Sequence, residues 1–168
     1  MSSKTPVNIR RNVESFNDPY IDQRSLEEAS VCKHCGSVYA AGRWYLKELL
    51  PEKMILKGEA EKTLCPACQK LRDHVPGGVL KITGEFLRSH REEIMNLIRN
   101  ESNKAQVVNP LGKIMTLEAI DNGIEITTTN EKLVQRIGRA LHKAYSGQVE
   151  YKWSDDTKLA RVNWHRQA

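Results

Sequence analysis

The hydrophobic and polar positions follow regular periods in the second half of the chain, but not at its N-terminus. Residues 1–30 are polar and their scattered hydrophobic residues keep no sustained period. This is typical of an extended or disordered arm, or of a tail that folds only on a partner, with one short helix expected at Ser25–Ala29. From Gly84 to Glu101 apolar residues recur at helical spacing, which predicts a helix with Thr83 as its N-cap.

A β-hairpin is expected further along the chain. Ile114–Ile120 and Ile124–Thr128 are rich in residues that favour strands, and they flank Asp121-Asn122-Gly123. Asn-Gly between two such runs favours a tight hairpin, because both residues tolerate a positive φ. The residues before this hairpin, Ser102–Gly112, contain Asn109-Pro110 and are expected to form a loop.

A second helix and a second hairpin complete the pattern. Thr128-Thr129-Asn130-Glu131 has the spacing of a capping box, which predicts a helix to about Tyr145 with Gly147 as its left-handed stop. Side chains then alternate along two strands that are joined by a turn at Ser154–Asp156. The apolar registers of these strands hold Val149, Tyr151 and Trp153, and then Ala160, Val162 and Trp164. Both tryptophans are expected in the core rather than on a base-stacking surface.

The four cysteines fall into two C-x₂-C pairs, Cys32-Lys33-His34-Cys35 and Cys65-Pro66-Ala67-Cys68. Two intervening residues allow both thiolates of a pair to contact one ion, and Gly36 suits the sharp turn after the first pair. Two pairs supply the tetrahedral sulfur set that structural Zn²⁺ prefers. We therefore expect one structural zinc ion, bound by Cys32, Cys35, Cys65 and Cys68.

The surroundings of the two pairs favour a treble-clef arrangement over a plain zinc ribbon. The pairs are separated by 29 residues, a gap that a hairpin and a short helical segment at Gly42–Leu50 would fill. Gln69–Arg72, directly after the second pair, is expected to begin a helix.

Other uses of the four cysteines stay open. An iron–sulfur or rubredoxin-like iron centre has the same four ligands, whereas a thioredoxin-type redox site would need only one C-x-x-C. Catalytic zinc is disfavoured, because four protein ligands leave no position for water. His34 is an alternative ligand inside the first pair, but the thiolates already fill four positions.

The predicted elements divide the chain into four parts. An arm covers residues 1–30, a Cys₄ zinc-binding domain 31–75, a linker containing Pro76-Gly77-Gly78 covers 76–83, and a helix followed by a ββαββ unit covers 84–168. The short, hairpin-linked strands favour a mostly antiparallel sheet with a helix on one face. The fold class is therefore α+β.

The charge of the chain permits an anionic partner without requiring one. Lysine and arginine number 26 against 21 acidic residues, for a net charge of +5. On the helix after Asn130, four cations share one narrow face, with no acid interleaved along the helix: Lys132, Arg136, Arg139 and Lys143. The opposite face is apolar: Leu133, Val134, Ile137, Ala140, Leu141 and Ala144.

Like charges at this spacing repel one another, and phosphates would relieve the repulsion. We therefore interpret the four cations as an RNA-facing surface, the alternative being a solvated face without a partner. A second candidate RNA contact is Arg43-Trp44-Tyr45, beside the first cysteine pair, where Trp44 is a candidate for base stacking.

Several classes of protein are disfavoured. The sequence has no G-x-x-x-x-G-K-[ST], no G-x-S-x-G and no H-E-x-x-H motif, so neither an enzyme nor a small-molecule substrate is expected. No run approaches the roughly 18 apolar residues of a membrane span, and the first residues lack the apolar core of a signal peptide. We therefore expect a cytoplasmic protein without a membrane partner, whose thiols are kept reduced.

The order of the motifs resembles the archaeal and eukaryotic large-ribosomal-subunit export adaptor family, named for nonsense-mediated decay, and especially its short stand-alone prokaryotic forms. The resemblance covers roughly residues 31–164. It rests on the paired knuckles and on Gly123-Ile124-Glu125-Ile126-Thr127, which leads through a capped helix and Ser146-Gly147 into two strands.

The resemblance implies a zinc-stabilised domain that docks on the large subunit, with the following module along the intersubunit face near the tRNA exit site. Eukaryotic members carry an export tail and more zinc-binding cysteines than the four of this chain. A role in nuclear export is therefore not inferred for this chain.

The expected function is that of a non-enzymatic zinc protein. It would bind the ribosome through rRNA phosphates and act in assembly, quality control or dormancy (hibernation). The first alternative is a zinc-stabilised protein–protein adaptor or a transcription-associated regulator. The second alternative is a redox or metal-handling role.

Overall fold

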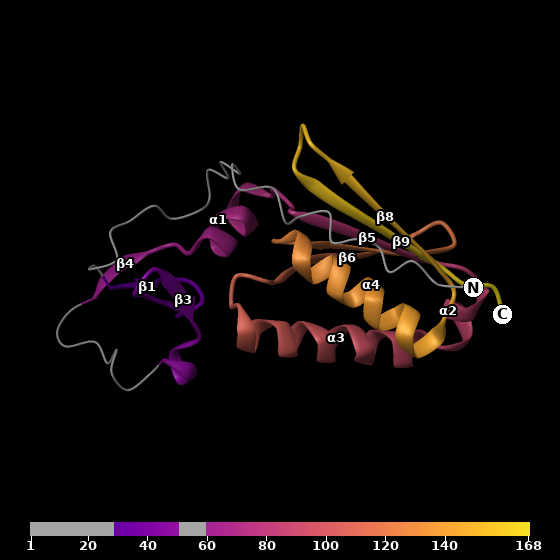
Figure 1. The fold of residues 1–168 in the computed structure, drawn as a ribbon, viewed down its shortest axis with the longest axis horizontal. Coiled ribbons are helices and arrows are strands. Elements are labelled where there is room, and N and C mark those ends of the chain that lie inside the picture. Colours follow the sequence, from indigo (N-terminus) through magenta and orange to yellow (C-terminus); the bar gives the residue numbers. More distant parts are fainter. Residues whose placement is uncertain (1–28, 51–59) are drawn as a thin grey trace, which may run out of the picture.

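The structure is a computed structural model that describes residues 29–50 and 60–168. Within these residues the chain forms two β-sheets and several helices, so the α+β class is confirmed (Figure 1). We call residues 30–50 and 60–73 the N-terminal module and residues 78–168 the C-terminal module. The arm expected at 1–30, with its helix at Ser25–Ala29, lies almost wholly outside the described residues, and Ser30 begins the first strand.

The N-terminal module combines a small sheet with one α-helix. Its strands are β1 (Ser30–Cys32), β2 (Val38–Ala40), β3 (Arg43–Tyr45) and β4 (Glu61–Thr63), in the order β3-β2-β1-β4. β1 pairs with β4 in parallel, and the other pairs are antiparallel. The α-helix is α1 (Pro66–Asp73), which agrees with the helix expected after the second cysteine pair.

The helical segment expected at Gly42–Leu50 is mostly wrong. Its first part is strand β3, and only Lys47–Leu49 forms a 3₁₀ turn, η1. Ala41 and Gly42 have φ values of 50° and 78°, and this left-handed pair turns the chain back on itself tightly enough for β3 to pair with β2. The resulting hairpin places Trp44 in the core of the module.

The C-terminal module is built on a five-stranded sheet. Its strands are β5 (Gly78–Thr83), β6 (Ile114–Ile120), β7 (Gly123–Thr128), β8 (Gln148–Ser154) and β9 (Leu159–His165). The order is β6-β7-β5-β9-β8, and only the β5–β9 pair is parallel among these neighbours. Both predicted hairpins and the mostly antiparallel sheet are therefore confirmed.

The linker expected at residues 76–83 is wrong, because residues 78–83 form β5, the central strand of this sheet. Leu80 and Ile82 are fully buried in the core. Gly78 is paired with Thr128 on β7 and Ala160 on β9. Position 78 favours glycine because α4 approaches it closely: a Cβ added there would lie 2.5 Å from Val134 Cγ2.

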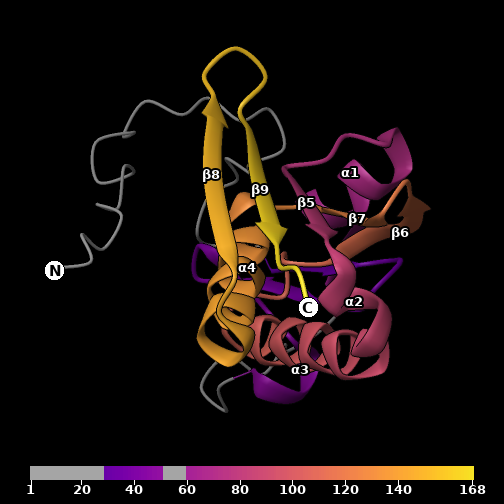
Figure 2. The same ribbon diagram turned by 90° about the vertical axis from the view of Figure 1, so that its right-hand side faces the viewer.

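The helices α2 (Glu85–Ser89), α3 (Arg91–Val108) and α4 (Glu131–Tyr145) lie on the same side of this sheet (Figure 2). α4 packs on the strands and α3 packs against α4. Their buried faces form the main core, which also contains the fully buried Trp164 and, at its margin, the half-buried Trp153.

The helix expected from Gly84 to Glu101 forms, but its limits differ. It breaks at His90 and continues to Val108, so the loop expected at Ser102–Gly112 is wrong for its first seven residues. Ser102 is buried and Ala105 packs against the core, which holds this last part in the helix. Thr83 is not the N-cap, because it ends β5 and its Oγ1 lies 2.9 Å from His165 Nδ1.

Helix α4 begins two residues later than the capping-box spacing suggests. The N-cap is Asn130, whose side chain accepts a hydrogen bond from the Leu133 N–H at 2.9 Å. Thr128 instead ends β7 and donates to the Asn130 carbonyl. At the other end, the left-handed Gly147 is confirmed, at φ 84°. Ala144, expected on the apolar face, is exposed.

Candidate metal centre

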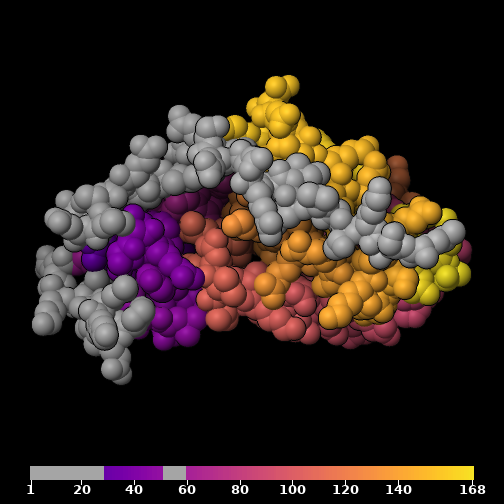
Figure 3. Space-filling model, in the orientation of Figure 1, coloured from indigo at the N-terminus to yellow at the C-terminus, as the bar shows by residue number. Residues whose placement is uncertain are grey.

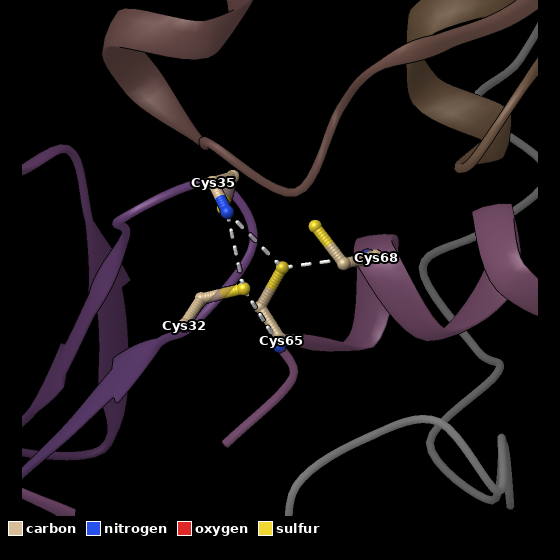
Figure 4. Close-up of side chains that lie close together, drawn as sticks. All are labelled: Cys32, Cys35, Cys65 and Cys68. Carbon is tan, nitrogen blue, oxygen red and sulfur yellow. Dashed lines mark hydrogen bonds between the residues drawn. The ribbon is translucent and has the colours of Figure 1, made fainter. Parts of the chain in front are cut away.

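Two turns from distant parts of the chain bring the four cysteines together (Figure 4). Cys32 ends β1, and Cys35 lies in the turn between β1 and β2. Cys65 is the N-cap of α1, and Cys68 lies in its first turn. The parallel β1–β4 pair places Cys32 opposite Thr63, and this register delivers the second cysteine pair beside the first.

The four Sγ atoms all lie within 4.8 Å of one another, and Cys35 Sγ is 3.7 Å from Cys65 Sγ. A tetrahedral site with Zn–S bonds of about 2.3 Å has sulfur–sulfur distances of roughly 3.8 Å. The cluster therefore has the dimensions of a four-coordinate sulfur site and is consistent with one structural zinc ion. His34 is exposed and is not part of this cluster.

Backbone amides of both turns point at the sulfurs. The Cys35 N–H donates to Cys32 Sγ at 3.5 Å, and the Cys68 N–H donates to Cys65 Sγ at 3.4 Å. The Cys65 N–H also donates to Cys32 Sγ, at 3.3 Å, which connects the two pairs. These hydrogen bonds stabilise negative charge on sulfur, and the N-terminus of α1 adds a favourable dipole.

The first turn depends on a glycine. Gly36 has a φ of 78°, a conformation that L-residues with a side chain rarely adopt, and its N–H donates to the Cys32 carbonyl at 2.9 Å. The sequence-based expectation that Gly36 allows the sharp turn after the first cysteine pair is therefore confirmed.

The thiols differ in their readiness to ionise. A hydrogen bond with the Cys65 thiol lowers the pKa of Cys35 to about 3, and the same hydrogen bond raises the pKa of Cys65. Burial raises the pKa of Cys68 to about 12. Cys65 and Cys68 thus keep their protons at neutral pH unless a cation compensates their charge, as a bound divalent metal does.

The four cations predicted on α4 do lie along one side of the helix, but that side is not free of acids. Lys132, Arg139 and Lys143 are exposed. Arg136 is half-buried, and its Nε donates to Glu101 Oε2 on α3 at 2.9 Å. No acid is interleaved among the cations on α4 itself, but the expectation that all four face outward is wrong at Arg136, which pairs with an acid on α3. We call the side of α4 that carries these four residues the cationic face.

The two residues of the second predicted RNA contact lie in different surroundings. Arg43 is exposed, and its Nη2 donates to the Val108 carbonyl at 2.7 Å. Trp44 is only 5% exposed, and its ring packs against Tyr39 with centroids 5.3 Å apart. The expectation that Trp44 stacks on a base is therefore wrong, because alternation along β3 turns its side chain into the core.

Sequence reasoning missed three residues that connect the modules. Lys70 Nζ on α1 donates to the Thr129 carbonyl at 3.1 Å, beside the start of α4. Leu111, from the loop before β6, packs into the core that contains Cys32, Cys65 and Cys68. Val108 accepts the Arg43 hydrogen bond. No local pattern marks these residues, since their partners lie far away in the sequence.

Comparison of the chain with protein-family models, with curated proteins and with solved structures found no match. Among the described residues, no helix has both the length and the apolar character that crossing a membrane requires.

Proposed function

We propose that this chain is a non-enzymatic zinc protein that binds ribosomal RNA through its phosphates. The observation that carries the proposal is the cationic face of α4. Lys132, Arg139 and Lys143 are exposed there, while the opposite side of the helix is packed into the core. A rigid helix that presents cations at this spacing is suited to contacts with a phosphate backbone.

The cysteine cluster supports a structural role for the metal. One cysteine pair lies in a hairpin turn and the other at the start of α1, which supports a treble-clef-like site over a plain zinc ribbon. Four protein sulfurs complete the coordination of zinc and leave no position for a substrate or a water nucleophile. The metal would therefore hold the N-terminal module together, which supports a binding protein over an enzyme.

The larger sheet favours phosphate contacts over base stacking. Its described strands contain three aromatic residues, Tyr151, Trp153 and Trp164, and all three pack against the core. RNA-binding sheets that read single strands present aromatic rings on their open face. This sheet lacks that surface, so the cations of α4 are the better candidate for the RNA contact.

The resemblance of the motif order to the large-subunit export adaptors supports the ribosome as the source of this RNA, and the large subunit as the part that is bound. A role in assembly, quality control or dormancy fits a protein that docks on the subunit without catalysing a reaction. The location that we propose is the cytoplasm, where ribosomes and reduced thiols occur together.

Gradient sedimentation with a matched pair of variants tests this proposal. Lys132→Ala/Arg139→Ala removes one lysine and one arginine from the cationic face. Lys152→Ala/Arg161→Ala removes the same charges from exposed positions on β8 and β9. We expect the wild-type protein and the control variant to migrate with large subunits, and the first variant to remain at the top of the gradient.

Retention of Lys132→Ala/Arg139→Ala in the large-subunit fraction, at the wild-type level, would contradict the proposal. The stability of both variants is expected to stay within about 0.5 kcal/mol of wild type, because exposed substitutions rarely change it more.

A protein–protein adaptor is the second candidate, and exposed apolar residues favour it. Val107 and Val108, at the end of α3, are 59% and 62% exposed. An apolar protein interface would keep its affinity as salt rises, whereas phosphate contacts would not.

A further inference from the structure

A groove of about 490 Å³ lies between the two modules. In the space-filling view, the indigo and purple surface of the N-terminal module adjoins the salmon and orange surface of the C-terminal module (Figure 3). One wall is formed by β3 and the start of α1, and the other by the end of α3, the loop before β6 and the start of α4. Because both modules contribute walls, the groove exists only when they are docked together.

Contacts between described residues of the two modules include two hydrogen bonds and one apolar contact. Arg43 donates to the Val108 carbonyl, and Lys70 donates to the Thr129 carbonyl. Leu111 packs into the core that surrounds the cysteines. All five of these residues line the groove, so the same groups dock the modules and shape the hollow.

Most of the charged residues that line the groove are cationic. Arg43, Lys70 and Lys132 reach it from three different elements, and Glu131 is the one acidic residue among the described lining residues. A smaller hollow of about 170 Å³ adjoins it and shares Val108, Asn109, Asn130 and Lys132 with it. This second hollow adds Arg136 and Arg139, so the positive charge continues from the N-terminal module along α4.

The groove also offers apolar surface beside these cations. Pro66 and Leu111 form part of its walls, and Val108, which is 62% exposed, lies on the border of both hollows. A concave surface that sets apolar carbon beside several cations fits a nucleotide, because the base can lie against carbon while the phosphate meets the cations. In a duplex the bases are stacked inside and cannot enter such a hollow.

We propose that this groove binds a single-stranded segment of RNA, in continuity with the cationic face of α4. The proposal rests on the proposed function and adds to it the kind of RNA structure that is bound. Asp and Glu side chains of an acidic peptide would satisfy the cations but carry no ring for the apolar walls, whereas every nucleotide of unpaired RNA brings both a base and a phosphate.

Two neighbouring valines provide a matched test. Val107 and Val108 are adjacent on α3 and almost equally exposed, but only Val108 lines the groove. Val108→Glu places a carboxylate in the groove, close to Arg43, where it repels phosphate. Val107→Glu makes the same change in net charge outside the groove. Zinc content and thermal melting of the full-length variants are measured to check that both are folded.

The measurement is the fluorescence anisotropy of a labelled oligouridine, titrated with wild-type protein and each variant at low salt. We expect Val108→Glu to weaken binding by at least about tenfold, since a like charge against phosphate costs about 1.4 kcal/mol or more. Val107→Glu should remain within about twofold of wild type, and an unlabelled RNA duplex should compete more weakly than unlabelled oligouridine.

Three results would overturn the inference. Equal affinities of the Val108→Glu and Val107→Glu variants for RNA would contradict RNA binding in the groove, and the cationic face would remain as the proposed RNA contact. If unlabelled polyglutamate competes as well as unlabelled oligouridine of equal charge, the groove would be a binding surface for an acidic protein instead. No binding of RNA by the wild-type protein, single-stranded or duplex, would contradict both the groove and the proposed function.

Discussion

Single side chains decide how much positive charge α4 offers to a partner. Arg136 lies in the middle of the cationic face, but its Nε donates to Glu101, and Lys104 Nζ lies 3.7 Å from the other oxygen of the same carboxylate. The side chains of Arg136 and Glu101 are 36% and 19% exposed. Arg136 is thus held partly against α3, whereas Arg139 and Lys132 are exposed.

This pairing leads to a prediction for Glu101. Glu101→Gln removes the carboxylate that holds Arg136, and it raises the net charge beside the cationic face by one unit. We expect the affinity for RNA to rise by about threefold or more, because Arg136 becomes available to a phosphate and a nearby negative charge no longer repels it. The measurement is RNA titration by fluorescence anisotropy at fixed salt.

Glu118→Gln is the control, because it makes the same change at an exposed position on β6. An equal gain from both variants would show a general charge effect, and a weaker affinity in Glu101→Gln would mean that Arg136 needs Glu101 to hold its position.

The four cysteines of the cluster could be predicted as neighbours from the sequence, but the burial of Trp44 and the pairing of Arg136 could not. The C-x₂-C spacing is a local signal, and all four cysteines do cluster. The burial of Trp44 depends on the Ala41-Gly42 turn, which makes its strand part of a hairpin. The Glu101–Arg136 pair joins two helices, so helical periodicity along α4 alone gives no sign of it.

At the scale of elements, the small sheet and α1 have little core apart from the cysteines. Half of the buried cluster in this module consists of Cys32, Cys65 and Cys68, and the other members are Tyr39, Trp44 and Ala67. A module of this size is expected to depend on its metal, because zinc binding supplies folding free energy directly. The C-terminal module has a much larger core that contains no cysteine.

Metal removal should therefore separate the two modules. We expect a strong chelator to abolish the dispersed amide resonances of residues 30–50 and 60–73 in a ¹H–¹⁵N spectrum. The resonances of residues 78–165 should remain dispersed, apart from shifts in the loop around Leu111, and added Zn²⁺ should restore the first set.

Cys68→Ser should give the chelated spectrum without a chelator, since three sulfurs and a hydroxyl bind zinc less well. A spectrum that is unchanged after complete removal of the metal would contradict the assignment of the cluster as a structural site.

The sequence predicts the elements with strong periodicity and misses those that tertiary contacts define. α4 and strands β6, β7, β8 and β9 follow from the helical and alternating patterns. β5 gives no such signal, because Pro76-Gly77-Gly78 is typical of a linker, yet Gly78 is required by the close approach of α4. The last two turns of α3 give none either, because they are mostly polar in sequence and the packing of the buried Ser102 and of Ala105 holds them in the helix.

At the scale of the whole molecule, contacts between the two modules connect the surroundings of the cysteine cluster to the start of α4, which carries the cationic face. Arg43 and Lys70 carry the link from the N-terminal module, and Leu111 joins the core around the cysteines to the loop before β6. A metal in the cysteine cluster would therefore affect the proposed RNA binding indirectly, because it would keep the module that provides one wall of the groove folded. The arrangement of the modules could not be derived from the sequence, since both bridging hydrogen bonds join residues about 60 positions apart.

The central claim is that phosphates bind to the cationic face of α4, and the salt dependence of binding tests it most directly. The measurement is the affinity for purified large ribosomal subunits over a range of salt concentrations, for wild type, Lys132→Ala/Arg139→Ala and Lys152→Ala/Arg161→Ala. We predict a steep fall of wild-type affinity with salt. In the first variant the log–log slope should be shallower by about 1.4 to 1.8 units, because each phosphate that the protein no longer neutralises contributes about 0.7 in a single strand and about 0.9 in a duplex. The control variant should keep the wild-type slope. An unchanged slope and affinity in Lys132→Ala/Arg139→Ala would contradict the claim and would make the cationic face a solvated surface.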